Sequence, residues 1–160
     1  MILGMPIFTF AHVVISLVGI VSGLVVTYGL LAAKRLDGWT LVFLATTLAT
    51  NVTGFLFPFH GITPALRLGA LSTIVLVVAI AARYAFRLSG AWRWIYAASA
   101  VVALYFNVFV LIVQAFQKVG PLKLLAPTQT EPPFLIAQAL ALLVFLAVGI
   151  GSVRRFHPAA

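Results

Sequence analysis

The sequence predicts an all-α, polytopic membrane protein built as a bundle of five transmembrane helices. Two observations carry this prediction. Hydrophobic residues make up 64 % of the 160 residues and charged residues only 8 %, far from the composition of soluble domains. Apolar runs of about 20 residues, the length that crosses ~30 Å of hydrocarbon, recur along the chain. We therefore expect one integral membrane domain over residues 1–160.

Polar, glycine-containing or proline-containing breaks separate the apolar runs. We expect five spans at about residues 7–33, 39–59, 65–87, 91–117 and 133–154, each long enough for a helix that crosses a bilayer. An external loop, 118–132, joins the last two spans. The first span should be retained as its own insertion signal, because it lacks a basic region before it and exceeds the length of a signal-peptide core.

The basic residues predict the orientation of the chain. With five spans the termini lie on opposite sides, and seven basic residues accompany the C-terminus while three accompany the N-terminus. The positive-inside bias then places the N-terminus outside and the C-terminus in the cytoplasm of a bacterial-type inner (plasma) membrane. The cytoplasmic set is Lys34, Arg35, Arg83, Arg87, Arg93, Arg154 and Arg155, and the external set is Arg67, Lys118 and Lys123.

Several function classes find no support in the sequence. The net charge of +8 does not indicate a nucleic-acid partner, because the basic residues lie between apolar runs and not in a soluble patch. The absence of cysteine excludes disulfides and thiolate chemistry. We assign no catalytic residue, since there are no paired carboxylates, no nucleophile elbow and no phosphate-binding loop. We recognise no known family in these motifs.

Polar side chains are predicted to meet in the outer half of the membrane. In the second span Thr47, Thr50, Asn51 and Gly54 share one helix face. Counting helical turns from the external boundary brings residues of four spans to similar depth. We predict a ligand-binding pocket there, roofed by the 118–132 loop. Alternatively, the same side chains form interhelical hydrogen bonds that set the register of the helices. The candidate binding residues are His12, Asn51, His60, Asn107, Gln114 and Gln138.

Three ligand chemistries are compatible with such a pocket. His12 and His60 could be the axial ligands of a haem b. The same pair with Glu131 could hold a divalent metal, although their scattered spacing does not indicate a metal site and we assign none. A quinone or a lipid could hydrogen-bond to the polar groups and rest against the rings of Phe55, Phe57 and Phe59.

Small residues predict where the helices approach one another. Gly19 and Gly23 in the first span and Gly54 in the second lie on such small-residue faces. Arg83 and Arg87, at the end of the third span, are expected to extend to the cytoplasmic headgroups.

The leading functional hypothesis is a non-catalytic inner-membrane protein that binds an apolar ligand or cofactor in this outer-half pocket. Such a protein could serve as an accessory subunit of a membrane complex. The alternative is an oligomeric channel or facilitator for a small neutral solute. The lipid bilayer is an expected partner under both hypotheses, and a membrane-protein partner or a homo-oligomer is compatible with both.

Overall fold

Every regular element among the described residues is a helix. The computed structural model describes residues 6–58, 61 and 64–158. Five long helices form its framework in this part of the chain. They are α1 (Ile7–Leu31), α2 (Asp37–Phe55), α3 (Pro64–Ile80), α4 (Trp92–Lys118) and α6 (Pro132–Arg155). A π-helical turn, η1 (Ala81–Ala85), continues α3, and a short helix, α5 (Gly120–Leu125), lies between α4 and α6.

Four of the described helical stretches are long and apolar enough to cross a membrane. They are Ile7–Leu31, Pro64–Ala85, Trp92–Lys118 and Pro132–Arg155, and they give the chain the architecture of a multi-pass membrane protein in contact with lipid. The predicted count of five spans is not confirmed, because α2 is not among the four. Five threonines, together with Asp37 and Asn51, lower the hydropathy of this 19-residue helix.

The helix boundaries follow from residues that stop or start a helix. α3 and α6 both begin at a proline, which has no amide hydrogen and loses nothing in a first helical turn. The third helical stretch ends where Arg87 and Leu88 adopt φ angles of 50° and 59°, a left-handed conformation that cannot continue a right-handed helix. α2 ends at Phe55, earlier than predicted, and the 118–132 loop contains α5.

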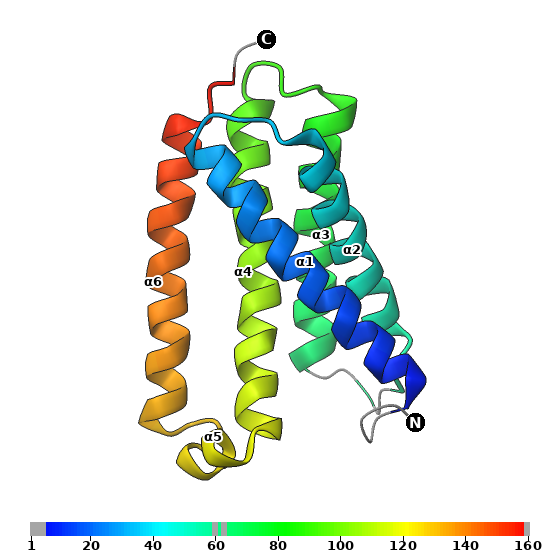
Figure 1. Ribbon diagram of the computed structural model, residues 1–160, viewed down its shortest axis with the longest axis vertical. Coiled ribbons are helices and arrows are strands. Elements are labelled where there is room, and N and C mark those ends of the chain that lie inside the picture. The colour runs from blue at the N-terminus through cyan, green and yellow to red at the C-terminus, as the bar shows by residue number, and fades with distance from the viewer. Residues whose placement is uncertain (1–5, 59–60, 62–63, 159–160) are drawn as a thin grey trace.

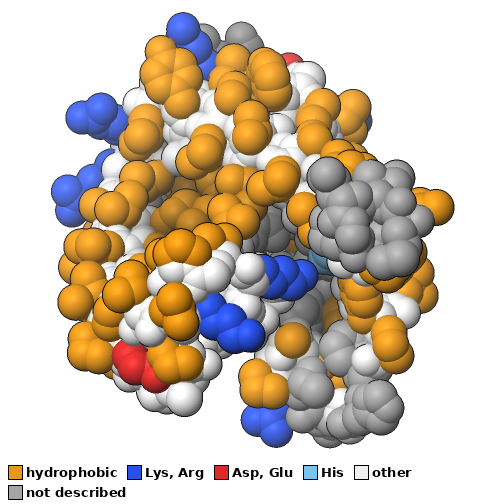
Figure 2. All heavy atoms as spheres, turned by 60° about the horizontal axis from the view of Figure 1, so that its bottom comes forward, with side chains coloured by type: hydrophobic (Ala, Val, Ile, Leu, Met, Phe, Trp, Pro, Cys, Tyr) orange, Lys and Arg blue, Asp and Glu red, His pale blue; other side chains and the backbone are white. Residues whose placement is uncertain are grey.

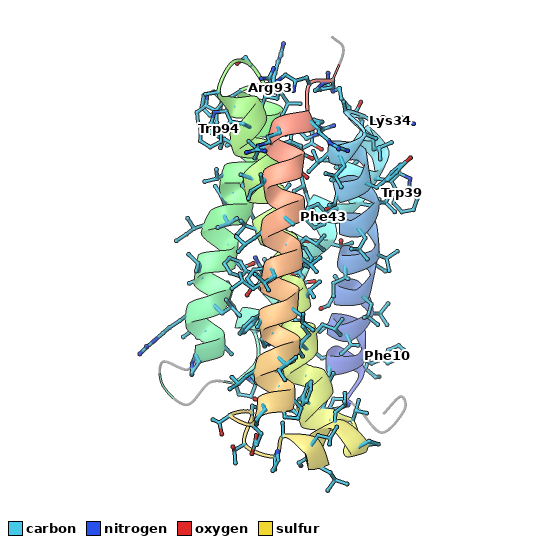
Figure 3. All side chains as sticks on the ribbon, turned by 90° about the vertical axis from the view of Figure 1, so that its left-hand side faces the viewer. Phe10, Lys34, Trp39, Phe43, Arg93 and Trp94 are labelled. Carbon is cyan, nitrogen blue, oxygen red and sulfur yellow. The ribbon has the colours of Figure 1, made fainter. Side chains whose placement is uncertain are left out.

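The long helices alternate in direction, as Figure 1 shows. α1 begins at the bottom of that view and α6 ends at the top, so the two ends of the described chain lie at opposite ends of the bundle. We call the end with residues 32–36, 86–91 and 156–158 the C-side, and the end with residues 56–58 and α5 the N-side. Figure 3 places Lys34, Trp39, Arg93 and Trp94 at the C-side and Phe10 toward the N-side.

α4 is the central helix of the bundle. It packs against α1, α3, α5 and α6, and its Ala97, Ala103 and Leu104 side chains are completely buried. The main hydrophobic cluster surrounds this helix and includes Phe43 of α2 and Leu76 of α3. α6 is peripheral by contrast, since none of the residues in its most apolar stretch is buried. A helix of this kind presents most of its surface to lipid.

Gly23 lies where α1 closely approaches both α2 and α4. A Cβ atom at this position would lie 2.6 Å from Leu104 Cδ1 of α4 and 2.8 Å from Phe43 Cε2 of α2. Real Cβ atoms do not approach other atoms so closely, so α1 can take its place only because residue 23 has no side chain. Gly19 is less confined, since its Cβ would lie 3.3 Å from Thr46 Oγ1.

Candidate functional site

His12 lies at the seam between α1 and α2, half-buried near the N-side. Its Nδ1 is 2.7 Å from the Thr53 hydroxyl oxygen of α2, and its ring meets the Phe57 ring edge-on at a centroid distance of 5.1 Å. Phe57 also contacts Phe8 of α1, with the centroids 5.0 Å apart. The imidazole also packs near Gly54, where a Cβ would make an ordinary contact of 3.7 Å with His12 Cε1.

The hydrogen bonds of Thr53 bear on which imidazole nitrogen carries the proton. The Thr53 hydroxyl has one hydrogen, and it donates this to the carbonyl oxygen of Ala49 at 2.7 Å. With its hydrogen on that carbonyl, the hydroxyl oxygen accepts from His12, whose Nδ1–H is then the donor. In the neutral imidazole Nε2 then keeps a lone pair, and no hydrogen bond joins Nε2 to another described residue. This is the tautomer that binds a metal ion or accepts a hydrogen bond through Nε2.

The candidate amides lie at different helix seams and bond to neighbouring helices. Asn51 and Ser72 of α3 exchange hydrogen bonds at 3.3 and 3.4 Å. Asn107 Nδ2 donates to Thr47 Oγ1 across the α4–α2 seam at 3.2 Å. Each of these bonds joins two helices, so these groups set helix register in the way such pairs do in membranes.

The two candidate glutamines differ in their contacts. Gln138 Nε2 of α6 donates to the carbonyl oxygen of Phe109 in α4 at 3.2 Å. Its Oε1 is buried without a hydrogen-bond partner among the described residues. Gln114 is half-buried on α4. The structure therefore distributes the candidate residues along several seams, while His60 lies outside the described residues.

The segment between α5 and α6 forms a structured cap at the N-side. Glu131 Oε1 accepts hydrogen bonds from the Thr128 hydroxyl at 2.8 Å and the Thr128 backbone N–H at 3.2 Å. Its Oε2 accepts a bond from the Thr130 backbone N–H at 3.1 Å. Partial desolvation opposes ionisation of Glu131, but these donors together outweigh it and lower the pKa of the carboxyl. Gln129 fastens the segment to α4, since its Nε2 donates to the Val113 carbonyl oxygen at 2.9 Å.

The N-side face of the molecule is hollowed, as Figure 2 shows. Apolar side chains line the hollow, and Lys or Arg side chains lie at its rim. The divergence of two helices accounts for its position. α1 and α6 are close at the C-side, where a Cβ at Gly151 would lie 3.0 Å from Leu31 Cδ2. They are far apart at the N-side, where α1 has crossed to the opposite edge of the bundle (Figure 1).

An ion pair between residues far apart in the sequence closes the C-side. Arg83 of η1 was expected to extend to the headgroups, but it is only 4 % exposed. Its guanidinium donates through Nη2 to Asp37 and to the Arg35 carbonyl oxygen, the latter at 3.3 Å. It also stacks over the Tyr96 ring, 5.2 Å from the centroid. The expectation failed because η1 and the start of α2 are 46 residues apart in sequence and meet only in the fold.

Two open apolar grooves flank α4. One, of about 310 Å³, lies between α4 and α6 and ends at Arg154. The other, of about 350 Å³, lies between α3 and α4 and includes Trp94. Both share Ala98 and Val102, so α4 forms the ridge between them.

No match to a known protein accompanies this geometry. The chain fits no protein-family model, and it is matched by no curated protein and no solved structure. The fold and the side-chain chemistry therefore carry the functional argument alone.

Proposed function

We propose that this chain is a non-catalytic inner-membrane protein of five spans that binds an amphipathic ligand on the external side of the bilayer. In this proposal α2 is the fifth span. At ~1.5 Å per residue its 19 residues are about 28 Å long, close to the ~30 Å of a hydrocarbon core. α2 is also sheltered between α1 and α3, which pack against it. The excess of basic residues at the C-side supports a cytoplasmic C-terminus.

The single observation that carries the binding proposal is the state of His12. An ionisable side chain inside a membrane span is costly and by default functional. In this proposal the Nδ1–H of His12 donates to Thr53, while Nε2 has no hydrogen bond to a described residue. The imidazole is thus held in one orientation by the protein and offers one lone pair.

The lone pair on Nε2 limits which chemical groups of a ligand can bind to it. Nε2 of the neutral ring is an acceptor, so it pairs with a hydroxyl donor and not with a carbonyl. A quinol head, which carries hydroxyl groups, therefore suits the site better than the oxidised quinone. The rings of Phe8 and Phe57 beside the imidazole would contact the apolar part of the ligand.

Haem b is the second ligand chemistry that this tautomer favours. A histidine that donates from Nδ1 to an oxygen and offers Nε2 to a metal is the usual arrangement of an axial ligand. His12 would then be one ligand and His60 the other.

Absorption spectra and ligand-dependent melting test the proposal. We expect decylubiquinol to raise the melting temperature of the purified protein, because a ligand that binds only the folded state stabilises it, by ~2.7 kcal/mol at 100 times its Kd. Decylubiquinone should have a smaller effect. His12→Ala should abolish the shift, whereas His157→Ala, a tail variant, should keep it.

The outcomes separate the ligands. A Soret band that is lost in His12→Ala would identify haem instead of quinol. If neither a band nor a quinol-dependent shift is found, His12 has only its structural bond to Thr53, and the binding proposal is wrong.

A further inference from the structure

The groove between α4 and α6 is a second feature with the properties of a binding site, and it is independent of His12. It is apolar along its length, with Val101 of α4 and Phe145 and Val153 of α6 among its lining residues. Space is available because Ala98 and Gly149 are small. A Cβ at Gly149 would make only an ordinary contact of 3.7 Å with Val101 Cγ1. Neither helix therefore fills the space between them.

The length and position of the groove match one leaflet of a bilayer. From Phe145 to Arg154 the groove follows ten residues of α6, and the nine steps between them rise by about 13 Å at ~1.5 Å each. One leaflet contributes roughly half of the ~30 Å hydrocarbon core. Arg154 lies in the last turn of α6 and is exposed, so its guanidinium is at the level of the headgroups when the groove is at the level of the chains.

The charges around the mouth of the groove favour an anion. Arg154 lines the groove, and the neighbouring Arg155 is also exposed. Arg93, at the start of α4 on the same side (Figure 3), has a buried Nε without a hydrogen-bond partner among the described residues. Asp37, the acid described at this end, is already bonded to Arg83. No described carboxylate therefore neutralises the cations at the mouth.

We propose that this groove binds an anionic phospholipid of the cytoplasmic leaflet. One acyl chain lies along the groove between α4 and α6, and the phosphate lies against Arg154. A second copy of the chain is a poorer occupant. Two copies inserted in the same direction would bring their Arg154 and Arg155 side chains together at the same depth, and like charges at an interface repel.

Native mass spectrometry of the detergent-solubilised protein tests the proposal. We expect dioleoyl-phosphatidylglycerol to remain bound in preference to dioleoyl-phosphatidylcholine, which has the same chains. Arg154→Gln should reduce the preference about fivefold, the effect of one basic residue on an anionic lipid. Arg155→Gln is the matched control, because it removes the same charge from a side chain that does not line the groove, and it should keep most of the preference.

A second variant tests the chain-binding part. Gly149→Leu puts a side chain into the groove and should remove binding of both lipids. Ala147→Leu adds the same side chain to an exposed position of α6 and should not. If Gly149→Leu does not fold, Arg154→Gln still decides the proposal.

Three results would overturn it. Equal losses from Arg154→Gln and Arg155→Gln would mean general attraction to the basic end. Displacement of the lipid by glycerol phosphate would mean that the site takes a free phosphate. A dimer that Gly149→Leu abolishes would mean that the occupant is a second copy.

Discussion

Arg83 donates a hydrogen bond to Asp37, and the two side chains differ greatly in their exposure to solvent. The arginine side chain is 3 % exposed and the aspartate side chain 72 %. The carboxylate remains hydrated, whereas the guanidinium depends on its few partners, and its Nη1 has none among the described residues. The pair joins the start of α2 to the end of the third helical stretch and so holds the C-side closed.

This asymmetry predicts unequal effects of the two single substitutions. Asp37→Ala should destabilise the protein by about 1–3 kcal/mol, because it leaves a buried cation without its counter-ion. Arg83→Met should cost less, since the exposed carboxylate stays solvated and the methionine fills the space. Unfolding in mixed detergent measures both. Arg87→Met, on an exposed side chain, is the control and should stay within about 0.5 kcal/mol of the wild type. A larger loss of stability from Arg83→Met than from Asp37→Ala would show that Asp37 depends more on the pair than Arg83 does.

Gly23 should tolerate side chains poorly. Gly23→Ala places a Cβ 2.6 Å from Leu104 Cδ1 and should cost about 1–3 kcal/mol through overpacking. Gly23→Leu should prevent assembly and lower the melting temperature more than His12→Ala does. Gly54→Ala is a suitable control, because its Cβ would meet nothing closer than 3.7 Å. A neutral Gly23→Ala would mean that α1 can move away from α4 without cost.

The Asn107–Thr47 hydrogen bond predicts a measurable coupling. A double-mutant cycle with Asn107→Ala and Thr47→Val should give a coupling free energy of about 0.6 kcal/mol, the average for such bonds in membranes. Both groups are buried, Thr47 completely and Asn107 to 9 % exposure. Additive effects in unfolding measurements would show that the bond does not contribute to stability.

The lowered pKa of Glu131 predicts that the cap between α5 and α6 stabilises the protein less at acidic pH. A carboxyl with a lowered pKa in the folded state contributes stability above its unfolded pKa and loses this contribution as the pH falls through the folded pKa. The wild type should therefore melt at a higher temperature than Glu131→Gln at pH 7. The difference should begin to shrink at about pH 4.3, the ordinary pKa of a glutamate, and vanish once the folded carboxyl is protonated at lower pH. A difference of the same size at pH 7 and at acidic pH would mean that the charge of Glu131 does not hold the cap.

The helical elements could be predicted closely because their signals are local. The boundaries of α1, α4 and α6 differ from the expected spans by two residues or fewer at each end, since long apolar runs and prolines define them. The membrane status of α2 could not be derived in the same way. Its hydropathy is reduced by polar side chains such as Asn51 and Thr47, which other helices cover.

The binding site, too, could be predicted from the sequence only in part. Depth along each helix follows from counting residues. The count placed His12, Asn51, Gln114 and Gln138 at comparable levels, with Asn107 near mid-membrane. The rotation of each helix about its axis and the identity of its neighbours do not follow from counting residues. Packing puts His12 against Thr53 and sends Gln138 to the Phe109 carbonyl, so residues of similar depth lie at different seams.

Composition and hydrophobic periodicity alone determined that this protein is a helical bundle in contact with lipid, and the spacing of basic residues determined which of its ends is the more positive. Only the tertiary structure decided that Arg83 is buried against Asp37, that α1 diverges from α6 to leave a hollow, and that α4 and α6 leave a groove ending at Arg154. The physical reason is the distance along the sequence over which each interaction acts. The free energy of transferring a helix into lipid depends on the residues of that helix alone. The partner of a buried polar group depends instead on how helices far apart in the sequence pack together.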